Sequence, residues 1–372
     1  HMIRLAKKES KEAIIAVCGC SAENHREALL PLGIDILIGN KDKSHIVELV
    51  EEYAKKREKI ARFYDMSKVP FEDMTLKSES NKTRAFVKIQ DGCDNFCAYC
   101  IIPYMRGALR SKDIDVATRE IAELVENGHS EIVLTGIHTG SYGRGKDYDL
   151  VDLIREISKL EGLKRVRISS IEVTELDDKF LDELKNNPKI CDHLHIPLQT
   201  GSDEILQFMD RKYDTAYFSQ KIEKIREIRP NISITTDLIV GFPHEKEANF
   251  EETVQFIKKI GFTKIHTFPF SLRNGTKAEK MKEYFVDELV KKKRVREILA
   301  LSNELEKTYY EKFLNQTLDV IVETSEGLES RGHTSNYILV NFKGLAKSGQ
   351  TVDVKITSLD GIIVNGEIEK VE

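Results

Sequence analysis

The sequence predicts an α/β protein built around an incomplete (β/α)6 barrel, with a smaller α/β unit before it and a small β-barrel after it. Strand-like and helix-like runs alternate in the middle of the chain, a pattern typical of parallel strands with crossover helices. Near the start, two short apolar runs each lead into a helix-like segment, and near the end short alternating runs are separated by Gly, Ser and Asp. These observations divide the chain into residues 1–62, a linker 63–83, the barrel 84–309 and the terminal β-barrel 310–372.

The first unit contains apolar runs at residues 13–17 and 34–38, and residues 46–53 repeat Ile, Leu and Val at helical spacing. We expect this unit to begin directly on the first strand and to lack partner strands, as in a domain truncated at its start. The linker 63–83 mixes Pro, Ser, Asn and Lys without sustained periodicity.

The barrel follows from strand-like runs that alternate with amphipathic helices. Leu150, Ile154 and Ile157 form one apolar stripe at helical spacing, and a second stripe ends before Gly261. In such barrels the active site lies at the carboxyl ends of the strands, so we expect the polar motifs that follow the strands to meet there. The predicted strands are residues 85–89, 131–135, 165–169, 193–198, 232–240 and 264–268.

The last part of the chain begins with a polar, charge-dense helix at about residues 286–310. Residues 291–296 within it are rich in Lys and Arg, which is typical of a solvated helix face, with an RNA contact as the less favoured alternative. The barrel that follows is expected to have the size of an OB fold. Its predicted strands are residues 318–322, 337–342, 352–356 and 362–368.

Composition excludes several classes of protein. With 372 residues and 40% hydrophobic content the chain can build a substantial core, and it contains no apolar run of about 18 residues, so we expect no membrane partner. A net charge of -5 gives no overall attraction to nucleic acid, so RNA binding requires local patches. Most of the six cysteines fall in two clusters, which favours metal ligation and a reducing, cytoplasmic location over a disulfide framework.

Cys93, Cys97 and Cys100 form the motif with the clearest chemistry, directly after a predicted strand. Thiolates are the usual ligands of iron-sulfur clusters, and three of them on a four-iron cluster leave one iron open to a reactive molecule. A structural zinc site requires a fourth ligand, and no further Cys or His lies nearby in the sequence. We therefore favour a four-iron four-sulfur cluster over zinc or inert core thiols.

This C-x3-C-x2-C spacing, with an aromatic residue before the last cysteine, resembles the radical S-adenosylmethionine (SAM) superfamily. Further segments resemble one branch, the methylthiotransferases, which insert a methylthio group into an unactivated C–H bond. Agreement along nearly the whole chain makes chance similarity negligible. The matching segments are residues 84–93, 101–107, 110–111, 169–172, 195–202, 237–243 and 268–276.

The resemblance implies that the open iron binds the amino and carboxylate groups of SAM, and that electron transfer from a flavodoxin or ferredoxin releases a hydrogen-abstracting 5′-deoxyadenosyl radical. A second SAM serves as the methyl donor. Each side chain implied to contact SAM has an alternative interpretation as a structural hydrogen-bonding or core residue. The implied SAM-binding residues are Tyr99, Gly136, His138, Ser170, Glu172, Gln199, Arg211 and Asp237.

Two further segments point to the substrate. Gly136-Ile-His138 resembles the branch that acts on N6-threonylcarbamoyladenosine beside the tRNA anticodon, although the same residues are compatible with a simple strand-to-helix turn. The alternatives are relatives that modify isopentenyl-adenosine in tRNA or an aspartate of a ribosomal protein, and an RNA-binding module with a structural cluster. The last region resembles a TRAM domain, which implies RNA contacts by Arg331, His333, Asn336 and Tyr337.

Methylthiotransferases carry a second iron-sulfur cluster on an N-terminal domain, and residues 17–23 resemble the last of its three cysteine motifs, with Cys20 at the ligand position. Cys18 stands where the family commonly has threonine, and Cys191 is expected to be a buried small residue. Since the two other motifs are not in this sequence, we expect it to bind one cluster and cleave SAM without completing methylthiolation.

Overall fold

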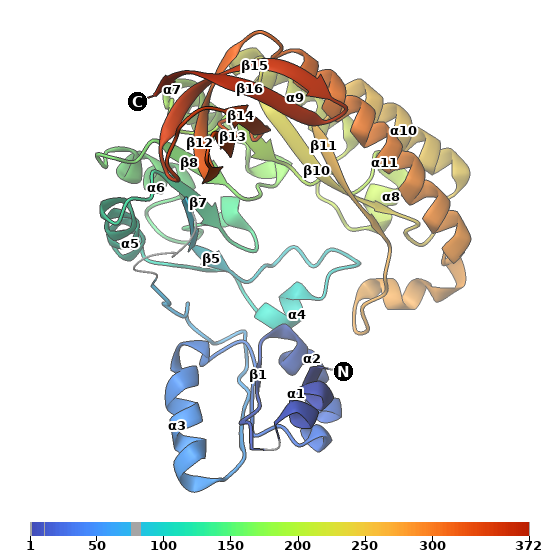
Figure 1. Ribbon diagram of the computed structural model, residues 1–372. Helices are drawn as coiled ribbons and strands as arrows, with labels where there is room; N and C mark the ends of the chain where they lie inside the picture. Colours follow the sequence, from blue (N-terminus) through green and yellow to red (C-terminus); the bar gives the residue numbers. More distant parts are fainter. Residues whose placement is uncertain (1, 11, 76–82, 372) are drawn as a thin grey trace.

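The computed structural model describes residues 2–10, 12–75 and 83–371, and its centre is a parallel sheet in two halves (Figure 1). One half has the strand order β4-β7-β8 and the other the order β9-β10-β11. A single parallel bridge between Val166 and Ile190 joins the halves. The strands, which confirm the six predicted ones within a few residues, are β4 (Arg84–Lys88), β7 (Glu131–Thr135), β8 (Arg165–Ile168), β9 (His193–His195), β10 (Ser233–Val240) and β11 (Lys264–Pro269).

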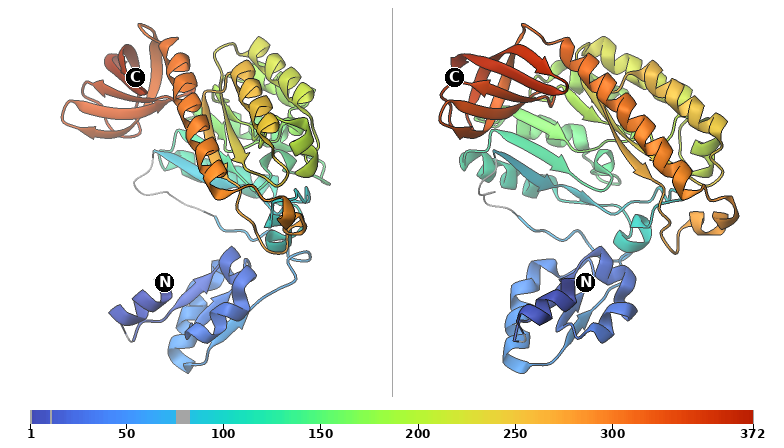
Figure 2. Two further views of the ribbon diagram at one scale, coloured as in Figure 1. Left: turned by 90° about the vertical axis from the view of Figure 1, so that its right-hand side faces the viewer. Right: turned by 45° about the vertical axis from the view of Figure 1, so that its right-hand side comes forward.

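Helices cover the outer face of this sheet and make it a partial (β/α) barrel (Figure 2). Their ends follow local sequence signals: Asp149 caps the amino end of α6 with Asp152, and Gly261 ends α10 in the left-handed conformation, with φ 63°. Apolar stripes on these helices pack on the strands and form one core. The helices are α5 (Ile114–Glu126), α6 (Leu150–Ser158), α7 (Asp178–Asn186), α8 (Asp203–Phe208), α9 (Thr215–Ile228), α10 (Glu247–Ile260) and α11 (Glu288–Glu311).

The chain ends in a closed five-stranded barrel with the strand order β12-β13-β14-β16-β15. Helix α11 ties this barrel to the sheet, because Ile298 belongs to the core of the sheet whereas Tyr309 and Tyr310 belong to the core of the barrel. Four strands match predicted ones, and β13 was not predicted. The strands are β12 (Thr317–Glu326), β13 (Glu329–Thr334), β14 (Leu339–Lys343), β15 (Thr351–Asp360) and β16 (Ile363–Val371).

The N-terminal unit is a three-stranded parallel sheet, β1-β2-β3, with small cores on its two faces. The prediction that it begins on a strand is wrong, since a helix precedes β1, and β3 was not predicted as a strand. Figure 1 places this unit below the barrel, next to the short helix α4 (Ile102–Arg106). Its elements are α1 (Met2–Glu9), β1 (Ala16–Cys18), α2 (Cys20–Leu29), β2 (Ile36–Ile38), α3 (Ile46–Lys56) and β3 (Ile60–Arg62).

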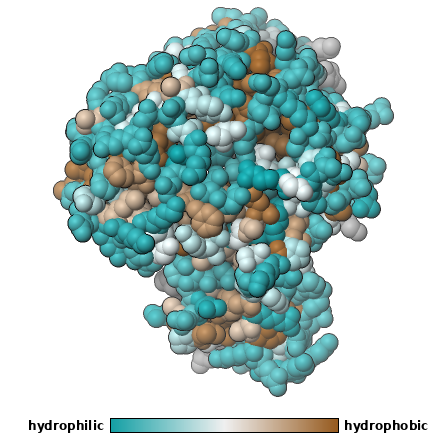
Figure 3. Space-filling model, turned by 180° about the vertical axis from the view of Figure 1, so that it is seen from behind, coloured by the Kyte–Doolittle hydropathy of each residue, from teal (hydrophilic) through white to brown (hydrophobic). Residues whose placement is uncertain are grey.

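The surface is largely hydrophilic on the face seen in Figure 3, with hydrophobic side chains in small patches between polar ones. None of the helices in the described ranges is long and apolar enough to cross a membrane. The predicted solvated face at residues 291–296 is partly wrong, because Lys291 and Arg294 are buried. Arg294 donates to Glu245 at 2.6 Å and thereby anchors α11 to the loop after β10.

Candidate active site

The three cysteines of the motif lie in one loop, which leaves the short strand β5 (Gln90–Asp91) and returns through α4 to β6 (Arg110–Ser111). Gly92 shapes this loop: its φ is 76°, and a Cβ atom there would lie 1.9 Å from the backbone oxygen of Ala108. The backbone N–H of Cys93 donates to Gly107 at 3.1 Å, which holds the two ends of the loop together. The loop therefore has one well-defined path at the carboxyl end of β4.

All three thiols are free and partly exposed, so they are accessible as ligands. Burial, together with the nearby Cys97 and Cys93, raises the pKa of Cys100 to about 11, so the three thiols lie near one another. In the described ranges, no three His, Cys, Asp or Glu side chains are arranged to hold a single metal ion. A soft donor set spread around one loop fits an iron-sulfur cluster better than a mononuclear site.

Arg211 connects this loop to the strand ends. Its guanidinium donates to the Cys97 Sγ atom at 3.3 Å, lies 3.5 Å from the Tyr99 hydroxyl, and forms an ion pair with Glu172. Burial raises the pKa of Tyr99 well above its usual range, so its hydroxyl stays protonated. Three of the residues implied to bind SAM therefore lie together beside a cluster cysteine.

His138 and Gly136 occupy the other side of the loop. The backbone N–H of His138 donates to the Gln90 side chain at 2.7 Å, and its Nδ1 atom lies 4.0 Å from the Cys93 Sγ atom. Its Nε2 atom lies 2.9 Å from Glu175. Burial alone would lower the pKa of His138, but Cys93 and Glu175 together raise it to about 10. The sequence analysis missed the roles of Gln90 and Glu175, although Gln90 lies within the matching segment 84–93 and Glu175 lies just after the segment 169–172.

The remaining residues implied to bind SAM lie farther along the strand ends. Gln199 has a φ of 68°, and its backbone N–H donates to Asp237 at 2.9 Å. Asp237 also lies 3.4 Å from the Nε2 atom of His195. Ser170 follows β8 and is partly exposed. With Asp237 inside β10 and the other residues after β5, β7, β8 and β9, this set forms an arc along the sheet.

Cys20 approaches the same loop from the N-terminal unit. Its Sγ atom accepts from Arg106 at 3.1 Å, and Arg106 also lies 3.4 Å from Asp91. The exposed Cys18 is two residues away, and Cys191 is buried, as the sequence predicts. Burial raises the pKa of Cys191 to about 11, in agreement with an unreactive core thiol.

The residues predicted to contact RNA differ in their exposure in the terminal barrel. Asn336 is only 6% exposed, and its amide donates to Tyr309 at 3.1 Å, so it is a structural residue. His333 and Tyr337 face the large barrel, and the Tyr337 ring stacks 4.7 Å from the His333 ring. Arg331 is exposed. The motif thus contributes mainly to the junction between the two barrels.

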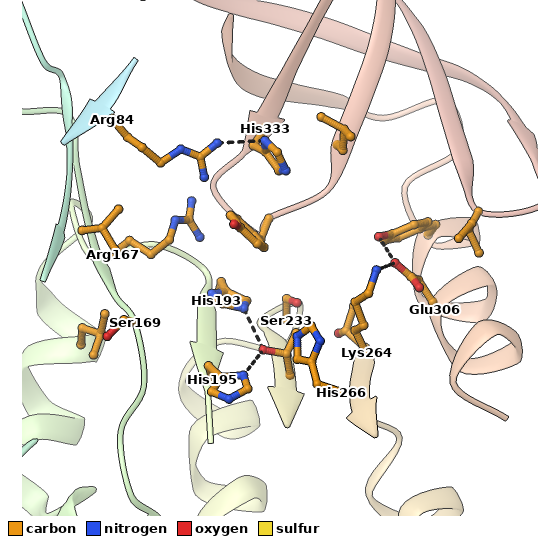
Figure 4. Close-up of a pocket in the computed structure, with 18 of the residues that line it drawn as sticks. Arg84, Arg167, Ser169, His193, His195, Ser233, Lys264, His266, Glu306 and His333 are labelled. Carbon is orange, nitrogen blue, oxygen red and sulfur yellow. Dashed lines mark hydrogen bonds and ion pairs between the residues drawn. The ribbon is translucent and has the colours of Figure 1, made fainter. Parts of the chain in front are cut away.

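A cavity of about 710 Å³ lies at this junction (Figure 4). Its walls are the inward-facing side chains of the parallel sheet and one side of the terminal barrel. Along one wall, the Thr235 hydroxyl is hydrogen-bonded to the Nε2 atom of His193 at 3.0 Å and to the Nδ1 atom of His195 at 2.9 Å. The polar residues that line the cavity include Arg84, Arg167, Ser169, His193, His195, Asp237, Lys264, His266, His333 and Tyr337.

Comparison with known proteins agrees with this architecture. A family model described as the radical SAM superfamily matches residues 87–257. The solved structure of the cobalamin-dependent S-adenosylmethionine radical enzyme OxsB superimposes with a TM-score of 0.50 at 12% identity, over 78% of this chain and 45% of that one, and shows the fold alone. The partial barrel and its loop of three thiols thus define a radical SAM enzyme.

Comparison with sequence relatives narrows the class. Threonylcarbamoyladenosine tRNA methylthiotransferase MtaB of Bacillus subtilis (strain 168) is 40% identical over 96% of this chain and 81% of its own length. Its namesake from Aquifex aeolicus (strain VF5) is 37% identical over 94% and 85%. The tRNA-2-methylthio-N(6)-dimethylallyladenosine synthase of Alkaliphilus oremlandii (strain OhILAs) is 32% identical over 98% and 79%. The chain belongs to the radical SAM methylthiotransferase family, whose cofactors are a four-iron four-sulfur cluster and SAM.

Proposed function

We propose that this enzyme adds a methylthio group to C2 of N6-threonylcarbamoyladenosine beside the anticodon of tRNA. The observation that carries the proposal is the higher identity to relatives named for threonylcarbamoyladenosine, at 35% to 40%, than to relatives named for dimethylallyladenosine, at 32% to 34%. The resemblance of the Gly136-Ile-His138 segment to the same branch supports it, and the segment lies beside the cysteine loop, where the backbone N–H of His138 donates to Gln90.

The side chains of the site have distinct roles in this proposal. Cys93, Cys97 and Cys100 hold the cluster, and Cys20 is one ligand of a second cluster whose site is incomplete in this sequence. Arg211 donates to the Cys97 Sγ atom at 3.3 Å and so places a positive charge beside this ligand. When bound, the cluster would supply the electron for the reductive cleavage of SAM, and a flavodoxin or ferredoxin would deliver that electron to it. The arc of Tyr99, Gly136, His138, Ser170, Glu172, Gln199, Arg211 and Asp237 positions SAM.

Production of 5′-deoxyadenosine by the anaerobically reconstituted protein, with SAM and dithionite, tests the chemistry. The parent should form it and Cys97→Ala should not, whereas Cys191→Ala, a matched loss of a thiol outside the loop, should retain the activity. Equal activity of the parent and Cys97→Ala would contradict the assignment of the loop.

The substrate is tested with tRNA that carries deuterium at C2 of the target adenosine, because hydrogen abstraction moves this label into 5′-deoxyadenosine. We expect transfer from tRNA with the threonylcarbamoyl group and little from tRNA with the isopentenyl group. The reverse preference would support the isopentenyl-adenosine alternative, and transfer from neither tRNA would overturn a tRNA substrate.

A further inference from the structure

The floor of the cavity at the junction includes Arg84 and Arg167, which belong to a cluster of three arginines. Arg84 begins β4, and Arg165 and Arg167 lie on β8. All three surround the buried Glu131: Arg167 donates to it at 2.7 Å, and Arg165 and Arg84 lie 3.4 Å and 3.9 Å away. One buried carboxylate therefore faces three guanidinium groups.

The other acidic partners of these arginines come from the terminal barrel and lie nearer the solvent. Arg84 pairs with Glu323, and Arg165 with Asp319 at 2.5 Å. The side chains of Glu323 and Asp319 are 26% and 51% exposed, against 2% for Glu131, so water screens their charges more strongly. Among the acidic partners of the three arginines, Glu131 alone is thus almost fully buried.

Burial and the arginines lower the pKa values of two imidazoles in the cavity. Burial and then the charges of Arg84 and Arg167 lower the pKa of His333 to about 3. Burial, Arg167 and the neighbouring imidazoles lower the pKa of His193 well below its usual range. Both rings are therefore neutral at physiological pH. The guanidinium groups of the arginines are then the charged groups beside them.

Aromatic rings form the wall above this floor. Tyr337 of the terminal barrel stacks 4.9 Å from His193, and the Arg167 guanidinium lies 4.6 Å from its ring centre. Along β10 the cavity extends from Ser233 to Asp237, a length of about 13 Å at the rise of a strand. The end of the cavity at Asp237 therefore reaches the arc of residues assigned to SAM, and the opposite end reaches Arg84 and Arg167.

We propose that this cavity binds the N6 side chain of the target adenosine, with the carboxylate of its threonyl group on Arg84 and Arg167. The inference rests on the proposed function and deepens it, because it names the residues that select the substrate. A carboxylate and guanidinium groups form paired, charge-assisted hydrogen bonds. A dimethylallyl group offers no such partner, so its entry would desolvate the arginines without compensation.

The ligand can be varied without changing the protein. Calorimetric titration of the reconstituted, SAM-loaded enzyme compares the nucleoside N6-threonylcarbamoyladenosine, its methyl ester and adenosine. The free acid should bind about 10-fold or more tightly than either other nucleoside, since it alone makes charged hydrogen bonds to the floor. Equal binding of acid and ester, or no binding of the acid, would overturn the proposal.

Protein variants test whether Arg84 contacts the carboxylate of the ligand. Arg84→Gln should remove most of the preference for the acid over the ester, whereas Arg119→Gln, on the exposed face of α5, should preserve it. Because Arg84 also joins the two barrels, circular dichroism must show that the variant is folded; if it is not, Tyr337→Ala takes its place and should reduce binding of the acid.

A preference for the acid that survives both variants would contradict the location of the carboxylate site. Deuterium transfer from threonylcarbamoyl tRNA without any acid preference would overturn this inference and leave the proposed function standing.

Discussion

At the scale of single residues, Gly92 determines whether the cysteine loop can close. A Cβ atom at this position would lie 1.9 Å from the Ala108 carbonyl oxygen, so the backbone would have to move. We expect Gly92→Ala to displace Cys93 and to lose most of the iron that the parent binds on reconstitution, about four atoms per cluster. Iron and protein quantitation on the same samples measures the effect.

Gly128 offers the matched control for this substitution. It also has a positive φ, 96°, but a Cβ atom there would meet no other atom within 4 Å. Gly128→Ala therefore shares the backbone strain without the collision, and it should bind iron like the parent. If both variants lost iron equally, the loss would reflect general destabilisation and not the shape of the loop.

At the scale of elements, α11 is held by a buried charge and not only by its apolar side chains. Arg294 pairs with Glu245 at 2.6 Å, and both side chains are almost fully buried. Removing the guanidinium leaves the Glu245 carboxylate buried without a charged partner. Arg294→Gln should therefore lower the free energy of unfolding by about 3 kcal/mol. Urea denaturation measures this, with the exposed Lys292→Gln expected to change it by less than about 0.5 kcal/mol. Equal effects of the two variants would contradict the anchoring role.

An element could be predicted from the sequence where its apolar residues recur at regular spacing. The barrel strands were predictable because buried runs alternate with amphipathic helices. Strand β13 was not, because its buried positions are Ser330, Gly332 and Thr334, which give no apolar alternation. Gly332 is required there by close packing, since a Cβ atom would lie 2.0 Å from the backbone oxygen of Ile321.

The same limit applies to the site. Spacing predicts Cys93, Cys97 and Cys100 as ligands, because the thiolate chemistry is local in the sequence. Gln90 and Glu175 were missed because their roles depend on contacts with the distant His138. The cavity was missed altogether, since the arginines of its floor and the Tyr337 of its wall come from different barrels.

At the scale of the whole molecule, the junction between the barrels makes stability depend on pH. The folded-state pKa of His333 is about 3, because burial and the charges of Arg84 and Arg167 disfavour its protonated form. An unfolded histidine titrates near 6.5. Below that pH the unfolded chain binds a proton that the folded chain does not, so the contribution of His333 is complete above about pH 6.5 and is lost as the pH falls toward 3.

Between pH 6.5 and 5 this linkage should lower the free energy of unfolding by about 2 kcal/mol. The His333→Gln variant lacks the titrating group, so its loss over the same interval should be smaller by about that amount. His25→Gln, at an exposed position on α2, should retain the parent's pH dependence. Urea denaturation of the three proteins at both pH values decides the matter: parallel pH profiles for the parent and His333→Gln would show that the junction does not carry the linkage.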